Sequence, residues 1–158
     1  MKKKVISIIL LIFAVLFLFS CKKEEKIVYS GAVMIYTSLS EDEIKKLKVD
    51  FENKYKGIVL DYFYGSVDTI NHMIEDEIDL GQIETDVLFF GNEQDMINLV
   101  NKDALKKYSP NNLKEKSNDY YTNINVSDNN SINLALTNNA LNETNGKYLI
   151  DFIVDYYK

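Results

Sequence analysis

Apolar residues along this chain follow two alternating patterns, one typical of buried strands and the other of amphipathic helices. Continuous apolar runs rich in β-branched and aromatic residues predict strands at 32–36, 58–64 and 86–90. After each run, apolar residues recur every three or four positions among charged ones, which predicts a helix. These helical positions are Ile44, Leu47, Phe51 and Tyr55, then Ile70, Met73, Ile74 and Ile78, then Met96, Leu99, Val100 and Leu105.

Three successive strand–helix units predict an α/β fold, with a mostly parallel sheet flanked by helices in a single three-layer lobe at residues 31–158. Residues 109–131 are dense in Asn, Ser and Asp and hold the only proline, Pro110, so they predict a loop. Residues 132–136 predict a short fourth strand. A final helix is expected to place Tyr148, Leu149, Phe152, Ile153 and Tyr156 on one face.

The N-terminus has the layout of a secretory signal peptide, with three lysines followed by an apolar stretch at residues 5–19 that is broken only by Ser7. Residues 18–21 resemble a bacterial lipobox. We therefore expect residues 1–20 to be a cleaved signal peptide, Cys21 to carry a lipid, and residues 21–30 to form a tether. The alternative is an uncleaved anchor helix, although the apolar stretch is shorter than the roughly 20 residues of a usual span. Both place residues 22 onward outside the cytoplasm.

Composition narrows the chemistry of the mature chain. Cys21 is the only cysteine, so no disulfide or thiol nucleophile remains after it. Removal of the three signal-peptide lysines changes the formal charge from −6 to −9, and the chain has no arginine. An acidic chain without arginine argues against a nucleic-acid partner. A small anion is still compatible, because backbone N–H groups hold anions without basic side chains.

Small polar residues follow each of the three predicted strands. Ser40 with Glu43 fits a capping box, and Ser66 and Asn92 are candidate N-caps that each follow a glycine. In a parallel sheet these turns meet at the carboxyl edge, where open α/β sheets bind ligands. Helix capping alone is the competing explanation, but the recurrence at three turns favours a site for an anion or a polyhydroxylated solute. The expected ligand-binding residues are Thr37, Ser38, Gly65, Ser66, Gly91 and Asn92.

Residues that would support catalysis are scarce. His72 is the only histidine and has no partner at metal-ligand spacing. The sequence contains no nucleophile elbow, P-loop or dinucleotide-binding fingerprint. The acidic triplets 41–43 and 75–77 are more simply explained as solvated helix faces. We therefore expect no enzyme activity, no metal site and no cofactor.

Several short segments, in order, resemble the solute-binding proteins of bacterial ABC importers, in the branch associated with ferric iron, phosphonates and sugar phosphates. They are residues 33–41, 51–55, 62–66, Glu77 with Gly81-Gln82 and 85–91, and 105–110. Residues 132–157 resemble a later part of the family, where the chain returns from a second lobe. The resemblance implies a periplasmic-binding-protein type II fold whose two lobes, joined by hinge strands, close on solute. Most of the second lobe is then missing here, with residues 111–131 as an irregular bridge at the deletion seam.

The resemblance implies a membrane-anchored lipoprotein that faces the periplasm or the cell exterior and delivers solute to an ABC permease. The implied solute is small and anionic, either phosphate-bearing or a ferric complex. The tyrosine pair that grips iron comes from the second lobe and has no counterpart here, and Leu39-Ser40 stand where some iron binders carry a histidine. The alternative is a stand-alone surface lipoprotein that acts as a protein-interaction module. A small flavodoxin-like enzyme ranks third.

Overall fold

The structure, a computed structural model, describes residues 28–111, 113 and 118–158. The predicted signal peptide and Cys21 lie outside these residues. The described chain contains strands β1 (Gly31–Thr37), β2 (Ile58–Tyr64), β3 (Val87–Phe90), β4 (Leu105–Lys106), β5 (Tyr121–Ser127) and β6 (Asn130–Thr137), and helices α2 (Glu41–Lys54), α3 (Val67–Asp79), α4 (Glu93–Asn101) and α5 (Glu143–Tyr156). No helix in this part of the chain is both long and apolar enough to cross a membrane.

The strands form one mixed sheet in the order β2-β1-β3-β6-β4, with β5 also paired to β6. β1 is parallel to β2 and β3, whereas β6 is antiparallel to β3, β4 and β5. The expected α/β class with a helix-flanked sheet is confirmed, but the sheet is less parallel than predicted. The difference comes from β6, which is antiparallel to all three of its neighbours; its hairpin connection to β5 accounts for one of these pairings.

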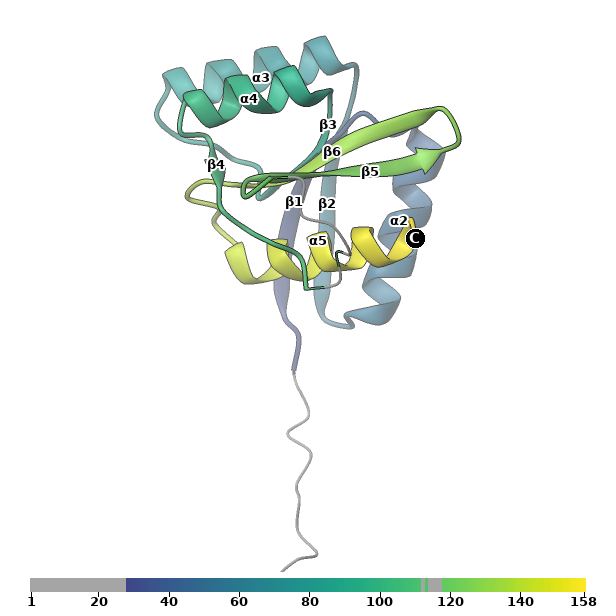
Figure 1. The fold of residues 1–158 in the computed structure, drawn as a ribbon. Coiled ribbons are helices and arrows are strands. Elements are labelled where there is room, and N and C mark those ends of the chain that lie inside the picture. Colours follow the sequence, from purple (N-terminus) through teal and green to yellow (C-terminus); the bar gives the residue numbers. More distant parts are fainter. Residues whose placement is uncertain (1–27, 112, 114–117) are drawn as a thin grey trace, which may run out of the picture.

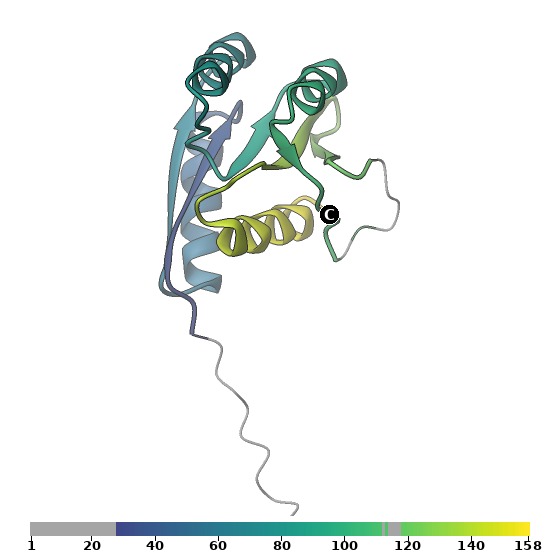
Figure 2. The ribbon, with the colours of Figure 1, turned by 90° about the vertical axis from the view of Figure 1, so that its left-hand side faces the viewer.

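Helices cover both faces of the sheet, as the three-layer prediction requires (Figure 1, Figure 2). α2 and α5 pack on one face and α3 and α4 on the other, each pair burying its own hydrophobic core. Strand β3 lies between the two cores, so Val87 and Phe89 face one of them while Leu88 and Phe90 face the other. Burial on both faces explains why β3 is a continuous apolar run in the sequence.

Two predictions about the second half of the chain are wrong. The segment expected to be a loop, 109–131, contains β5, in which Tyr121, Thr122 and Ile124 are buried while Asn123 and Asn125 are exposed. The third helix does not reach Leu105, because α4 ends at Asn101 and Leu105 pairs with β6. β4 and β5 lie end to end along β6, because β4 pairs with Leu136 and Thr137 and β5 pairs with residues 130–135.

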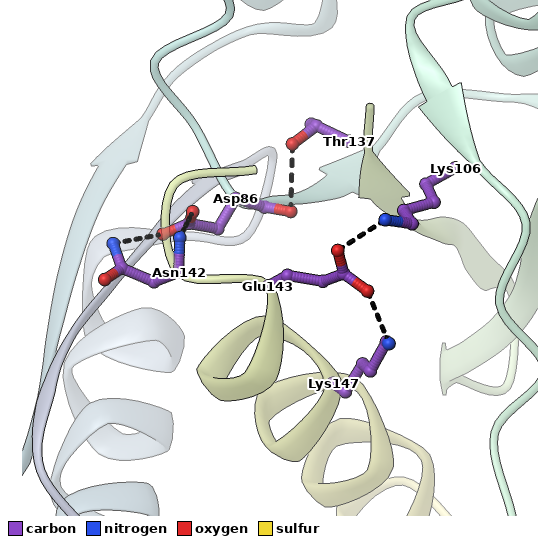
Figure 3. A network of polar contacts seen from close by, with 6 residues as sticks. All are labelled: Asp86, Lys106, Thr137, Asn142, Glu143 and Lys147. Atoms are coloured by element: carbon purple, nitrogen blue, oxygen red, sulfur yellow. Dashed lines mark hydrogen bonds and ion pairs between the residues drawn. The ribbon is translucent and has the colours of Figure 1, made fainter. Parts of the chain in front are cut away.

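The C-terminal segment is fastened to the first half of the lobe by a polar network (Figure 3). The buried carboxylate of Asp86 accepts hydrogen bonds from the backbone N–H of Met34 at 2.9 Å and of Asn142 at 2.7 Å, and from the Asn142 amide at 3.2 Å. Next to it, Glu143 forms ion pairs with Lys106 and Lys147. Hydrogen bonds from these two lysines lower the pKa of Glu143 to about 2. The network joins β1, β3, β4 and the start of α5.

The outer edge of the sheet at β2 is also capped by side chains. Leu60 donates its N–H to Glu52 at 2.9 Å and accepts a hydrogen bond from Lys48 at its carbonyl. Lys48 and Glu52 form an i,i+4 ion pair on α2. The ammonium and carboxylate groups of these side chains therefore satisfy backbone groups of β2 that could otherwise pair with a strand of another molecule.

Candidate functional site

A pocket of about 220 Å³ lies at the carboxyl edge of the parallel strands. Four stretches of chain line it: Ser38 after β1, Val67 at the start of α3, Gly91-Asn92 after β3, and Asn130-Ser131-Ile132 at the start of β6. β6 begins at this edge because it runs antiparallel to β3. The pocket therefore lies where α/β sheets usually bind ligands.

Three of the six predicted ligand-binding residues, Ser38, Gly91 and Asn92, line this pocket. The other three lie in the same turns but have structural roles. Thr37 is fully buried, donating its hydroxyl to the Phe89 carbonyl at 2.8 Å and accepting the Leu39 N–H at 3.1 Å. Gly65 donates its N–H to the Thr37 carbonyl at 3.1 Å. Ser66 lies one residue before Val67 and caps α3.

All three predicted helix caps are present. Ser40 and Glu43 form a capping box on α2, and Ser66 accepts the Thr69 N–H at 3.1 Å on α3. Asn92 forms a second capping box with Asp95 on α4. Helix capping therefore explains part of the recurrence of small polar residues at these turns, in agreement with the competing explanation given above.

Capping also determines which polar groups remain for a ligand. The amide oxygen of Asn92 accepts the N–H groups of Gln94 and Asp95, which leaves its NH₂ group for a ligand. The N–H groups of Val67 and Asp68 come too early in α3 to have an intrahelical acceptor. Among the described residues, the hydroxyl of Ser38 has no hydrogen-bond partner.

Glycine is required at position 91. Its φ is +70°, and a Cβ atom there would lie 2.7 Å from the Oδ2 atom of Asp95. That carboxylate must stay close, because it accepts the Asn92 N–H at 2.8 Å and completes the capping box. The tight turn places the Gly91 carbonyl toward β6, where it accepts hydrogen bonds from Asn133.

The wall formed by residues 130–132 was missed in the sequence because these residues lie far along the chain from the three βα turns. The polar pair Asp128-Asn129, between two alternating segments, was the available signal for a hairpin turn. Once 109–131 is assigned to a loop, that signal has no strand on its N-terminal side. The hairpin, and with it this wall, then goes unpredicted.

The charges around the pocket are negative. Five carboxylates lie within three residues along the chain of a lining residue, and no lysine does. They are Glu41, Asp68, Glu93, Asp95 and Asp128. The nearest lysine along the chain, Lys45, forms an ion pair with Glu41, and its hydrogen bond lowers the pKa of that carboxyl. Within the described part of the chain, no group of three His, Cys, Asp or Glu residues is placed to hold a metal ion.

A larger hollow of about 450 Å³ lies at the opposite edge of the sheet, among the turns before β3, after α4 and after β6. None of the predicted site residues lines it. The nearby segment 77–82, part of the family resemblance, is engaged in internal contacts: Glu77 accepts the Tyr36 hydroxyl at 2.6 Å and the Glu84 N–H at 3.0 Å. Burial and this hydrogen bond to Glu77 raise the pKa of Tyr36. The larger hollow therefore contains none of the six predicted ligand-binding residues, although Gly81 and Gln82 of the family resemblance line it.

No protein-family model matches the sequence, and no curated protein is similar to it. Solved structures with a similar fold include periplasmic and substrate-binding proteins of ABC transporters. Iron-bound HitA from Pseudomonas aeruginosa is 19% identical with a TM-score of 0.49, over 59% of this chain and 31% of that one. Apo ferric ion-binding protein A of Pasteurella haemolytica is 20% identical with a TM-score of 0.48, over 60% and 31%.

AfuA from Actinobacillus pleuropneumoniae, solved with fructose-6-phosphate, is 18% identical with a TM-score of 0.48, over 58% of this chain and 28% of that one. The chain thus spans about a third or less of the length of these three proteins. The proteins named in these structures are binding proteins.

Proposed function

We propose that this chain is the lipid-anchored, extracytoplasmic solute-binding component of an ABC importer, in a form that lacks most of the second lobe. The observation that carries the proposal is the pocket at the carboxyl edge. Turns after β1 and β3 and the start of α3 converge there, each with small polar residues. The function is capture of a small solute and its delivery to a permease, without catalysis.

The hairpin β5–β6 supports the proposed loss of the second lobe. β5 leaves along β6, and β6 enters the sheet antiparallel between β3 and β4. The two strands correspond in this proposal to the hinge strands of the two-lobed family. Only Asp128 and Asn129 join them. We therefore place the deletion seam at this turn, rather than across residues 111–131.

The point at which the tether joins the lobe supports delivery from an anchored position. Tyr29 packs edge-on against Tyr55 and Tyr148, with ring centroids 5.0 and 5.3 Å apart. These rings lie at the amino end of β1, opposite to the pocket, so a lipid on Cys21 would leave the pocket edge unobstructed. Eight residues of tether reach roughly 25–30 Å when extended, which lets the lobe turn toward a permease in the same membrane.

A thermal-shift screen of the full chain, purified from membranes in detergent, tests solute capture. The panel holds phosphonates, sugar phosphates, ferric salts and neutral sugars. We expect at least one solute to raise the melting temperature of the wild type but not of a Ser38→Ala, Asn92→Ala double variant. Ser127→Ala with Asn125→Ala is the matched control, because both residues are exposed and neither lines the pocket. If no solute stabilises the wild type, capture by this chain is refuted.

Anchoring needs a separate experiment, because it depends on Cys21 alone. We expect the wild type to sediment with membranes and a Cys21→Ala variant to appear in the soluble extracytoplasmic fraction. A variant that sediments like the wild type would point instead to the uncleaved anchor helix.

One observation favours the alternative, a surface lipoprotein that acts as a protein-interaction module. Leu80 and Leu141 are 84% and 75% exposed, and Leu141 lines the larger hollow at the opposite edge. Adjacent permease and ATPase genes would favour the importer. Their absence, together with loss of a binding partner in a Leu141→Ser variant, would favour the interaction module.

A further inference from the structure

The pocket at the carboxyl edge is lined by groups that are polar but uncharged. Ser38 and Ser131 contribute hydroxyls, and Asn92 and Asn130 contribute amides. Hydroxyls and amides both donate and accept hydrogen bonds, which matches the hydroxyl groups of a polyol. Val67 and Ile132 add apolar surface that suits the C–H groups of such a molecule.

The size of the pocket limits the solute. A volume of about 220 Å³ holds roughly seven water molecules at about 30 Å³ each. It is smaller than the pockets of roughly 300–1,000 Å³ that enclose drug-sized ligands. A solute the size of one monosaccharide would fill it and keep part of its surface in solvent.

The hairpin forms one side of the pocket, and it is held in place by a buried amide. Asn133 is 2% exposed and donates to the Gly91 carbonyl from its side chain at 3.2 Å and from its backbone N–H at 3.4 Å. Its amide oxygen accepts the Asn123 side chain at 3.2 Å. These bonds tie β5, β6 and the turn after β3 together. The residues just before Asn133 are therefore positioned opposite Gly91 and Asn92.

The carboxylates near the pocket determine the charge it accepts. Each of the five lies one to three residues from a lining residue. Glu41 is paired with Lys45, which leaves four carboxylates without a lysine partner among the described residues. A carboxylate about 9 Å from a bound monovalent anion weakens the binding of that anion roughly twofold at low ionic strength. The four unpaired carboxylates together outweigh the partial positive charge of the α3 N-terminus and give a penalty of roughly tenfold.

From these observations we infer that the pocket accepts uncharged or positively charged polyhydroxylated solutes in preference to anions, and that the tip of the β5–β6 hairpin supplies one of its walls. This inference rests on the proposed function and names the solute class of the same site. It differs from the anionic or ferric solute that the family resemblance implies. The difference arises because the turns here carry acidic residues, and the pocket carries no basic ones.

Three probes with one ring scaffold and different charge test the inference: glucose, glucosamine and glucose 6-phosphate. Each is titrated into the isotopically labelled full chain in detergent at low salt, and backbone amide shifts are followed by NMR. We expect glucose and glucosamine to shift the amides of both walls, Ser38, Val67, Gly91 and Asn92 on one side and Asn130, Ser131 and Ile132 on the other. Glucose 6-phosphate should need at least tenfold higher concentration for the same shifts.

The outcomes separate the inference from the proposed function. If glucose 6-phosphate shifts these amides at the lowest concentration, the solute class is wrong while solute capture stands. If shifts are confined to residues 38–92, the hairpin wall is wrong. If none of the probes shifts any pocket amide, both the solute class and capture at this edge are refuted for the polyhydroxylated solutes represented.

Charge variants give a second, independent readout. Replacing Asp68→Asn, Glu93→Gln and Asp128→Asn together should tighten glucose 6-phosphate binding about eightfold at low salt and leave glucose binding unchanged. The control is a second triple variant, Asp76→Asn, Asp79→Asn and Asp155→Asn. It removes the same amount of charge at positions away from the pocket and should change the affinity for neither sugar. Equal effects of the two triple variants would mean that net charge, rather than the pocket, governs the preference.

Discussion

Replacing Asp86 by Asn tests whether the C-terminal segment is an integral part of the lobe. The Asp86 carboxylate is 1% exposed, and one oxygen accepts the Asn142 N–H while the other accepts Met34 N–H and the Asn142 amide. An asparagine keeps the shape but replaces one oxygen with an NH₂ group. That group would face N–H donors, so at least one donor loses its acceptor.

The magnitude follows from the number and kind of hydrogen bonds. A hydrogen bond to a charged group contributes about 1.5–3 kcal/mol, and a donor left without an acceptor costs about 1–3 kcal/mol. One or two bonds lost in this site give a loss of about 3–4 kcal/mol in the free energy of unfolding. For a chain of this size, that corresponds to a fall of roughly 10–15 °C in melting temperature.

Urea denaturation followed by circular dichroism measures this loss, with Asp76→Asn as the control. Asp76 is exposed on α3, so its variant should stay within about 0.5 kcal/mol of the wild type. Hydrogen exchange should show faster exchange at the Met34 and Asn142 amides of the Asp86 variant. An Asp86→Asn protein within about 1 kcal/mol of the wild type would refute the fastening role of this carboxylate.

Three further predictions concern stability and association. Gly57→Ala should lower the free energy of unfolding by about 2–3 kcal/mol in urea denaturation, because φ is +108° and the new Cβ would clash with the Tyr29 carbonyl; an unchanged midpoint would contradict this. Glu143→Gln should be less stable than the wild type above pH 4.5, with the difference shrinking toward pH 2, since the native pKa is lowered from 4.5 to about 2; a difference independent of pH would contradict it. Lys48→Ala with Glu52→Ala uncaps the β2 edge and should cause concentration-dependent association by light scattering, whereas a monomeric variant would show that the cap is dispensable.

Local signals in the sequence were sufficient for the three βα units. The strand at 58–64 and the helix after Ser40 match β2 and α2, because a residue's position in a strand or amphipathic helix shows directly in its hydrophobic spacing. Caps are likewise local, since Ser40 and Glu43 interact across a single turn. These units also brought Ser38, Gly91 and Asn92 to one edge as expected, because parallel strands place their following turns together.

Strand β5 could not be recognised in the same way. Its residues Asn123 and Asn125 have low strand propensity and are exposed, so the segment resembles a loop when taken alone. It becomes a strand because β6 provides a partner and both faces of the sheet are covered there, so that Ile124 is buried in one core and Tyr121 in the other. The helical spacing that includes Leu105 is misleading for a related reason. Leu105 pairs with Thr137, a residue 32 positions further along the sequence, so no local pattern shows that it belongs to a strand.

The sequence by itself determined the α/β class, the order of the first six elements, the capped helix starts and the edge where their polar turns gather. All of these follow from patterns that span a few positions, together with the general rule that successive βα units form a parallel sheet. Tertiary structure alone decided the antiparallel entry of β6, the hairpin wall of the pocket and the gathering of carboxylates around uncharged lining groups. These depend on pairing between distant strands, such as Phe90 with Asn133, which no local pattern encodes.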